Sequence, residues 1–271
     1  MEDPALEPHL GFGITAQREP SSVGLAQLGE GLEELGYDEL WANDARLGSG
    51  LATLAAALGT TRRLDLCLGV APLSERNPQE IATEVEALGL PHPRLVLGVG
   101  TGSGSSLDSV RDGVEMLRRL LPDVRVAVAA LGPRMCALGG EIGDLVLLNW
   151  SFPARIAWSR ERIAGGAALV GRPTPRVAAY VRMAIGPDAR SRLISEADRY
   201  RGRPRPYARL FDDEGASGEK VPGIAAVQPI EAAALLAPYR AALDSCVIRA
   251  LPAEAGAAGW LQIAKAATLQ P

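Results

Sequence analysis

The residues best suited to chemistry lie in the stretch "VRVAVAALGPRMCALGGEIGDLVLLNW", residues 124–150, where a Gly-Pro pair follows an apolar run. A helix that begins at Gly132 and Pro133 leaves backbone N–H groups free in its first turn, at the positive end of the helix dipole. These groups could bind a phosphate. Glycine and proline also suit such a turn for steric reasons alone, so the motif by itself leaves both interpretations open.

A second glycine-rich turn, "GVGTGSGSS" at 98–106, follows another apolar run. Its amides and hydroxyls could surround a phosphate, although no lysine follows the glycines as it does in a Walker loop. Ser103 stands where a dinucleotide-binding fingerprint would need a glycine. The turn is therefore either a flexible connection or, together with the turn at Gly132, part of a site for one phosphorylated ligand.

Asp44 is the carboxylate best placed for acid–base chemistry, because it directly follows the apolar run that ends in "LWAN". It could act as an acid, as a base or as a ribose-binding group. Alternatively, it caps a helix or forms an ion pair with Arg46 or Arg76. The sequence leaves these roles open.

The two histidines, His9 and His92, each precede an apolar run, which predicts that both lie away from the strand ends where chemistry collects. Neither a Ser-His-Asp triad nor a histidine-rich metal site is therefore expected. Trp41 and Trp150 could flank a flat ligand, but they could equally fill the core.

Short runs rich in Val, Leu and Ile alternate with longer segments of helical period, a pattern typical of parallel strands joined by helical crossovers. Eight strands with eight helices indicate a (β/α)8 barrel spanning 1–271 as one domain, with its site at the carboxyl ends of the strands. The expected strands are 9–15, 37–43, 64–71, 94–100, 124–130, 143–149, 176–185 and 244–251. The expected helices are 21–35, 49–59, 78–89, 105–121, 133–141, 153–168, 188–201 and 254–268.

The segment 202–229 interrupts this alternation and is expected to be an irregular excursion after the seventh helix. A position after the helix would place it at the rim away from the catalytic end, which favours a structural or interface role over the alternative, a substrate lid. The residues at the ends of the first six strands are candidates for the catalytic rim. Besides the turns at 98–106 and 130–132, they are Ile14, Thr15, Gln17, Trp41, Asn43, Asp44, Val70, Ala71, Pro72, Arg76, Asn77, Asn149 and Trp150.

The composition is that of an ordinary water-soluble chain, with 47% apolar residues, 22% charged residues and a net charge of -4. This balance gives no electrostatic footprint for nucleic acid. Because no apolar run reaches the roughly 18 residues that span a bilayer and the first residues do not read as a signal peptide, a cytoplasmic protein without membrane contact is expected. The cysteines Cys67, Cys136 and Cys246 lie far apart in apolar segments, which predicts reduced core residues.

Several segments, taken in order, resemble the luciferase-like monooxygenase superfamily, and within it the short members that use the deazaflavin coenzyme F420. They are "LEELGYDELWANDARLGSG", "LGVAPLSERNPQEIATEVEAL", "RLVLGVGTGS", "AALGPRMCALGGEIGDLVLLNW", "AAYVRMAIGPDARSRLISEADRY" and "LDSCVIRALP". The third and fourth segments together are fairly specific, whereas any one segment alone would be weak.

This resemblance implies a barrel that binds F420, or alternatively FMN, at its carboxyl end, and a homodimer in which the helix at 49–59 could pack closely across the interface. It also implies a cis peptide bond at Gly69-Val70 and a cofactor phosphate held by the turn at Gly132. The residues expected to bind the cofactor are Gly69, Val70, Ala71, Gly100, Thr101, Gly102, Ser103, Ala130, Leu131, Gly132, Pro133, Arg134, Asn149 and Trp150.

One departure from the family concerns the residues after strand two, where the family commonly has Asp-His and this chain has Asp44-Ala45. The imidazole that the family often has near the flavin is therefore missing, but hydride transfer does not require it. The resemblance implies hydride transfer between reduced F420 and a small organic substrate, with Asp44 as the expected catalytic acid. One alternative is an FMN-dependent monooxygenase supplied with reduced flavin by a partner reductase. Another is a catalytically degenerate barrel that serves as a binding or scaffold protein.

Overall fold

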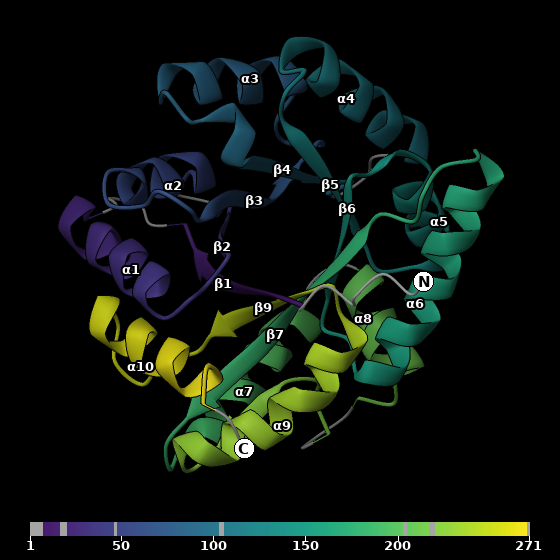
Figure 1. The fold of residues 1–271 in the computed structure, drawn as a ribbon. Helices are drawn as coiled ribbons and strands as arrows, with labels where there is room; N and C mark the ends of the chain where they lie inside the picture. The colour runs from purple at the N-terminus through teal and green to yellow at the C-terminus, as the bar shows by residue number, and fades with distance from the viewer. Residues whose placement is uncertain are drawn as a thin grey trace, which may run out of the picture.

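Parallel strands close into a ring in the computed structural model, which describes residues 8–16, 21–45, 48–102, 106–202, 205–216 and 220–269. The ring runs β1-β2-β3-β4-β5-β6-β7-β9 and returns to β1, while β8 pairs only with β7 (Figure 1). The strands are β1 (His9–Thr15), β2 (Glu39–Asn43), β3 (Asp65–Pro72), β4 (Leu95–Gly100), β5 (Arg125–Ala130), β6 (Leu145–Asn149), β7 (Arg176–Ile185), β8 (Ile224–Ala226) and β9 (Ser245–Ala250). The predicted (β/α)8 barrel is confirmed.

Helices surround this ring, as Figure 1 shows, and α1 lies beside α10. They are α1 (Ser22–Glu34), α2 (Gly50–Leu58), α3 (Pro78–Ala87), α4 (Leu107–Leu120), α5 (Pro133–Ile142), α6 (Pro153–Leu169), α7 (Ala189–Arg201), α8 (Arg205–Asp213), α9 (Pro229–Ala242) and α10 (Ala257–Ala267), with a 3-10 turn η1 (His92–Arg94) before β4. Local sequence explains many of the starts. For example, Asn77 and Glu80 form a reciprocal capping box around Pro78 at the first turn of α3.

Side chains on alternate strand residues fill the barrel interior in layers. At the amino ends of the strands, the buried carboxylate of Glu39 accepts hydrogen bonds from Trp41 Nε1 at 2.7 Å and Ser245 Oγ at 2.6 Å, and pairs with Arg176 at 2.7 Å. Above it lies an apolar layer made of Trp41, Cys67, Val96, Ala127, Leu145, Leu147, Ala178, Tyr180 and Val247. The interior is therefore closed at its amino-terminal end and through its middle.

The crossover between the last two barrel strands differs from the sequence prediction. Helix α9, which no predicted helix covered, is the element that leads into β9, so α7, α8 and β8 together are an insertion after β7. Pro238 lies inside α9, and a proline in a helix interior usually argues against a helix. The segment is also Ala-rich and lacks a clear polar face. For these two reasons the sequence does not predict the helix.

The segment 202–229, expected to be irregular, contains α8 and β8 among its described residues. It was also expected to lie away from the catalytic end, and this was wrong. Tyr207 of α8 accepts a hydrogen bond of 3.0 Å from Asn149 Nδ2, and Glu214 accepts one of 3.0 Å from the Phe152 N–H. Because β8 pairs with the last three residues of β7, the insertion is held at the carboxyl ends of the strands.

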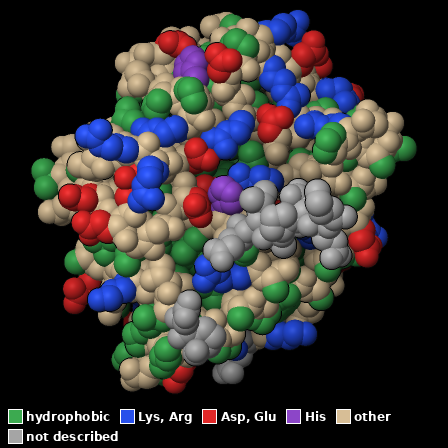
Figure 2. Space-filling model, in the orientation of Figure 1, with side chains coloured by type: hydrophobic (Ala, Val, Ile, Leu, Met, Phe, Trp, Pro, Cys, Tyr) green, Lys and Arg blue, Asp and Glu red, His purple; other side chains and the backbone are tan. Residues whose placement is uncertain are grey.

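The outer surface carries mixed charge. Figure 2 shows Lys and Arg side chains interspersed with Asp and Glu side chains over the face in view, in keeping with the small net charge of -4. Within the described part of the chain, no helix combines the length and apolarity needed to cross a membrane. The three cysteines are buried and unbonded, as predicted.

Candidate active site

The inward-facing layer nearest the carboxyl ends of the strands is polar, unlike the layer beneath it. Thr15 is exposed and Asn43 and Asn149 are half-buried, so this layer is open to solvent. The two arginines of this layer, Arg182 and Arg249, are buried. The layer consists of Thr15, Asn43, Asn149, Arg182 and Arg249, above the ring of Tyr180.

Arg249, on β9, is held by uncharged partners. Its Nη2 donates to Thr15 Oγ1 at 2.5 Å and to Asn43 Oδ1 at 2.7 Å, and its guanidinium lies 5.5 Å from the centre of the Tyr180 ring. The side chain is 7% exposed, and Nη1 has no hydrogen-bond partner.

Arg182, beside it on β7, is 2% exposed and sits among aromatic rings. Its guanidinium lies 3.9 Å from the centre of the Trp150 ring and 5.1 Å from that of Tyr200, and Nη1 donates to Asn149 Oδ1. Burial lowers the pKa of the Arg182 guanidinium, and the charge of Arg249 adds to this effect. Nε has no partner.

The peptide bond Gly69-Val70 on β3 is cis, as predicted. The Gly69 carbonyl oxygen accepts a hydrogen bond of 2.7 Å from the Tyr180 hydroxyl. The pairing of β3 with β4 shifts register between Leu68 and Ala71, so the half-buried side chain of Val70 lies at the boundary between the apolar and polar layers.

The turn into α5 matches its predicted form. Gly132 is the N-cap residue, no side chain caps it, and Pro133 begins the helix after Ala130 ends β5. A Cβ atom placed on Gly132 would meet nothing within 4 Å, so the space beside these backbone groups is open. Arg134 is exposed in the first turn, and the Leu131 carbonyl accepts a hydrogen bond of 3.0 Å from Arg155.

The turn after β4 lies next to this helix start, because a Cβ atom on Gly100 would come within 3.3 Å of Ala129 on β5. Thr101 is half-buried. Gly102 has a φ of 64°, a left-handed conformation that favours glycine, and packs closely on Ser74. Ser103 lies outside the described residues.

Asp44 has partners on both carboxylate oxygens. Oδ1 accepts from the Gly50 N–H at 2.8 Å, and Oδ2 pairs with Arg76 Nη1 at 2.8 Å. Arg76 also pairs with Glu84 at 2.5 Å. The structure thus places Asp44 in the ion pair that was its alternative role, while its role as an acid stays a prediction. Arg46 lies outside the described residues.

Trp41 and Trp150 both pack in the interior. Trp41 is fully buried in the apolar layer of the barrel. Trp150 is 1% exposed and packs on Phe211 and Tyr200 of the insertion, with ring centres 5.4 and 5.2 Å apart. Neither ring offers an open face to solvent.

The insertion is tied to the rim by a buried carboxylate. Glu214 Oε1 lies 4.0 Å from Arg155 Nε, and burial raises the pKa of Glu214 to about 7. His9 and His92 do not contribute to the rim, because His9 begins β1 beside Glu39 and His92 lies in η1.

Arg182 and Arg249 were missed in the sequence. The available signal was period-two alternation, which places Tyr180 with Arg182, and Val247 with Arg249, on the inward side of otherwise apolar strands. A charged residue inside a buried strand is more informative than an apolar one.

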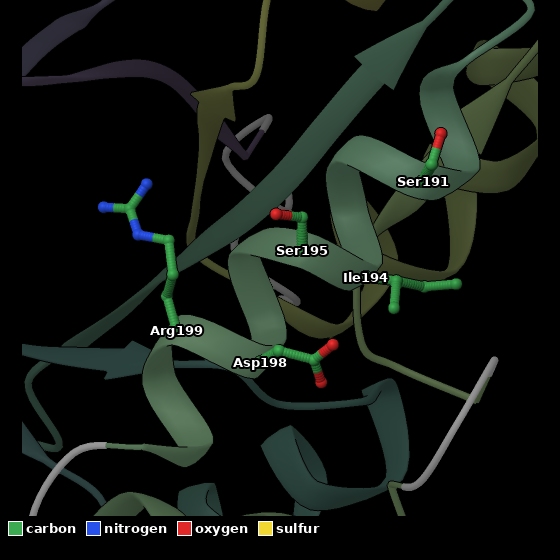
Figure 3. Close-up of a pocket in the computed structure, with 5 residues that line it drawn as sticks. All are labelled: Ser191, Ile194, Ser195, Asp198 and Arg199. Carbon is green, nitrogen blue, oxygen red and sulfur yellow. The ribbon is translucent and has the colours of Figure 1, made fainter.

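A separate surface pocket follows helix α7 and contains no barrel-strand residue. Figure 3 shows Ser191, Ile194, Ser195, Asp198 and Arg199 along one side of this helix. A neighbouring pocket adds Ala250, the last residue of β9, and the two residues that follow it. Since Ser191, Ser195, Asp198 and Arg199 are exposed, this feature is distinct from the polar layer of the barrel.

The fold and this layer define a (β/α)8 barrel with a ligand site at the carboxyl ends of its strands. The family model described as luciferase-like monooxygenase matches residues 13–120 and 110–234. The chain therefore belongs to the luciferase-like monooxygenase family.

Two curated relatives are 5,10-methylenetetrahydromethanopterin reductases. The protein from Methanolobus tindarius is 26% identical, and the alignment covers 66% of each chain. That from Archaeoglobus fulgidus is 24% identical over 58% of each chain. The matched region thus spans less than two thirds of either relative.

Solved structures share the fold at low identity. An F420-dependent secondary alcohol dehydrogenase has a TM-score of 0.76 at 15% identity, covering 97% of this chain and 99% of that one. The F420-dependent tetrahydromethanopterin reductase from Methanopyrus kandleri has a TM-score of 0.74 at 18% identity, covering 97% and 98%. The FMN-bound oxygenating component of 3,6-diketocamphane monooxygenase from Pseudomonas putida has a TM-score of 0.69 at 14% identity, covering 96% of both.

Proposed function

We propose that the protein transfers a hydride between coenzyme F420 and a small organic substrate at the polar layer of the barrel. The observation that carries this proposal is the arrangement of that layer, which is open at the carboxyl end, lies above an apolar floor and borders an uncapped helix start. Two similar solved structures with high TM-scores, 0.76 and 0.74, are F420-dependent enzymes, which supports F420 over FMN.

The residues present fit such a cofactor. The backbone N–H groups at the start of α5, with Arg134 and the turn from Gly100 to Gly102 beside them, would hold the phosphate. Val70, with the cis peptide bond before it, would lie against the ring. When bound, the cofactor supplies the hydride-carrying carbon, and the protein fixes its distance and face toward the substrate.

The side chains of the protein would supply the proton that the substrate needs. Asp44 remains the proposed acid, although it would have to leave either the Gly50 N–H or Arg76 to meet a substrate. The family histidine is replaced by Ala45, so no imidazole stands beside Asp44 to share this work.

A second candidate is an FMN-dependent monooxygenase that receives reduced flavin from a partner reductase. It is favoured by the similarity to the FMN-bound 3,6-diketocamphane monooxygenase component. Titrating purified F420 and FMN separately into the protein, with cofactor fluorescence as the readout, distinguishes the two. Preferential F420 binding supports hydride transfer, FMN preference supports the oxygenase, and binding of neither contradicts both.

We also propose a homodimer. Helix α2, expected at its interface, packs against α1 and has no exposed residue, so any dimer contact there would involve only its half-buried side chains, such as Ala52 and Ala56. Light scattering at micromolar concentration should return twice the 28.4 kDa of one chain, and a monomeric mass would contradict the proposal.

A further inference from the structure

Two adjacent arginines are buried in the polar layer. Arg182 and Arg249 are register partners on β7 and β9, and their side chains are 2% and 7% exposed. Within the described residues, neither makes an ion pair with an Asp or Glu. Glu196, which pairs with Arg199, acts on Arg182 electrostatically without forming an ion pair with it. Burying two like charges side by side is costly unless an opposite charge or several hydrogen bonds compensate.

The hydrogen bonds that they make do not use all their donors. The partners are the neutral oxygen atoms of Asn149, Thr15 and Asn43, while Arg182 Nε and Arg249 Nη1 have none. Guanidinium groups present N–H donors in a fixed fork that matches the oxygen atoms of a carboxylate or phosphate. The missing partner therefore has the chemistry of a small oxyanion.

The position of the pair separates it from the proposed phosphate site. In the ring of eight strands, β9 stands opposite β4, and β7 stands opposite β3. The glycine-rich turns follow β4 and β5. β4 lies across the barrel from Arg249, and β6 separates β5 from β7, so a phosphate held there would lie on other strands than the arginines. The apolar layer below, with Val247 under Arg249, leaves the open carboxyl end as the direction of approach.

We infer that Arg182 and Arg249 bind an anionic group of the substrate, so that the substrate is a small carboxylate or a related oxyanion. This inference deepens the proposed function and rests on it, because the bound anion is a substrate only if the protein carries out the proposed reaction. The same chemistry could instead recognise a negative charge on the ring of the cofactor, and the experiment separates the two sources.

The test uses the full-length, cofactor-free protein at low ionic strength and compares acetate and benzoate with their neutral amides, acetamide and benzamide. Tryptophan fluorescence is the readout, because Trp150 stacks on Arg182. At least one anion should bind about tenfold or more tightly than its amide. Equal affinity of each anion and its amide, or no binding of either anion, would overturn the inference.

Variants then assign the site. Arg182→Gln and Arg249→Gln should each weaken binding of the anion about tenfold, while Arg119→Gln, which removes a charge from a side chain 63% exposed on α4, should leave that binding unchanged. Should either glutamine variant fail to fold, Arg182→Lys and Arg249→Lys keep the charge but lose the fork, and they should still weaken binding. Unchanged affinity in folded variants refutes the assignment.

Cofactor binding by the same variants identifies the source of the anion. Under our inference, the affinities for F420 and FMN change less than twofold. If they fall tenfold instead, the arginines recognise the cofactor ring and the substrate assignment is wrong. If the parent protein binds benzoate in preference to benzamide but neither cofactor, the proposed function fails while the anion site stands.

Discussion

The hydroxyl group of Tyr180 on β7 donates a hydrogen bond of 2.7 Å to the carbonyl oxygen of Gly69 on β3, across the interior of the barrel. Both residues are buried, and burial raises the pKa of the Tyr180 hydroxyl, so the group stays protonated and can donate. The bond joins two strands that face each other in the ring, at the boundary between the apolar layer and the polar layer.

Tyr180→Phe should lower the free energy of unfolding by about 1 kcal/mol, because the buried Gly69 carbonyl oxygen loses its donor. It should also weaken cofactor binding, since this bond holds the strand beside the proposed ring site. Tyr37→Phe is the matched control, because Tyr37 donates to the Ala264 carbonyl oxygen at 2.9 Å, far from the rim. Equal cofactor affinity in the two variants, measured by fluorescence titration, would show that the Tyr180 bond serves stability alone.

Gly132→Val tests the phosphate site. A Cβ atom at this position would meet no atom within 4 Å, and φ is -106°, so the variant should fold with the thermal stability of the parent. If the phosphate binds at the start of α5, the side chain occupies its place and affinity for both cofactors should fall strongly. Gly165→Val, at another position with open space, is the control. Parental affinity in folded Gly132→Val places the phosphate elsewhere.

Arg134→Ala should weaken cofactor binding about tenfold without abolishing it, because the backbone N–H groups and the helix dipole remain. Calorimetric titration measures this change. A complete loss of binding would mean that the exposed Arg134 side chain, and not the backbone, carries the interaction.

Asp44→Asn should lower the rate of cofactor oxidation more than it weakens cofactor binding, if Asp44 delivers a proton. The change also removes the ion pair with Arg76, so Glu84→Gln, which removes the other partner of Arg76, serves as the control. Parental activity in Asp44→Asn would exclude the acid role. An equal loss of activity in both variants would trace the effect to the position of Arg76.

The raised pKa of Glu214 should make the free energy of unfolding fall as pH rises. Its pKa is about 7 in the folded protein against 4.5 for an unperturbed group, so the folded state binds more protons between these values. The stability due to the neutral form is complete below about pH 4.5 and is lost as pH rises through 7. Glu214→Gln should therefore melt at higher temperature than the parent at pH 8, whereas Glu161→Gln, at a position 77% exposed, should not. A melting temperature at or below the parent's would contradict this cause.

Much of the fold could be predicted because its signals are local. Apolar runs placed β1 and β7 to the residue, and the Gly-Pro pair placed the start of α5. The cis peptide at Gly69-Val70 was expected only through the family resemblance. Helix α9 was missed because Pro238 argues locally against a helix that packing against the barrel nevertheless stabilises.

The site was harder to predict, since it depends on which strands meet. Arg182 and Arg249 are 67 positions apart in sequence numbering, and only closure of the ring brings them into register. Asp44 shows the opposite difficulty, because an isolated carboxylate at a strand end looks reactive until its partners Gly50 and Arg76 are known.

The buried carboxylate of Glu39 has a consequence for the order in which ligands arrive. Together with Trp41 and Arg176 it closes the amino-terminal end of the barrel, so among the described residues only the carboxyl ends of the strands leave a way in. Two ligands that share one opening cannot exchange independently when one lies deeper than the other. Under the proposed function, whichever of cofactor and substrate is bound nearer the floor should therefore enter first and leave last, and a saturating concentration of the other should trap it inside.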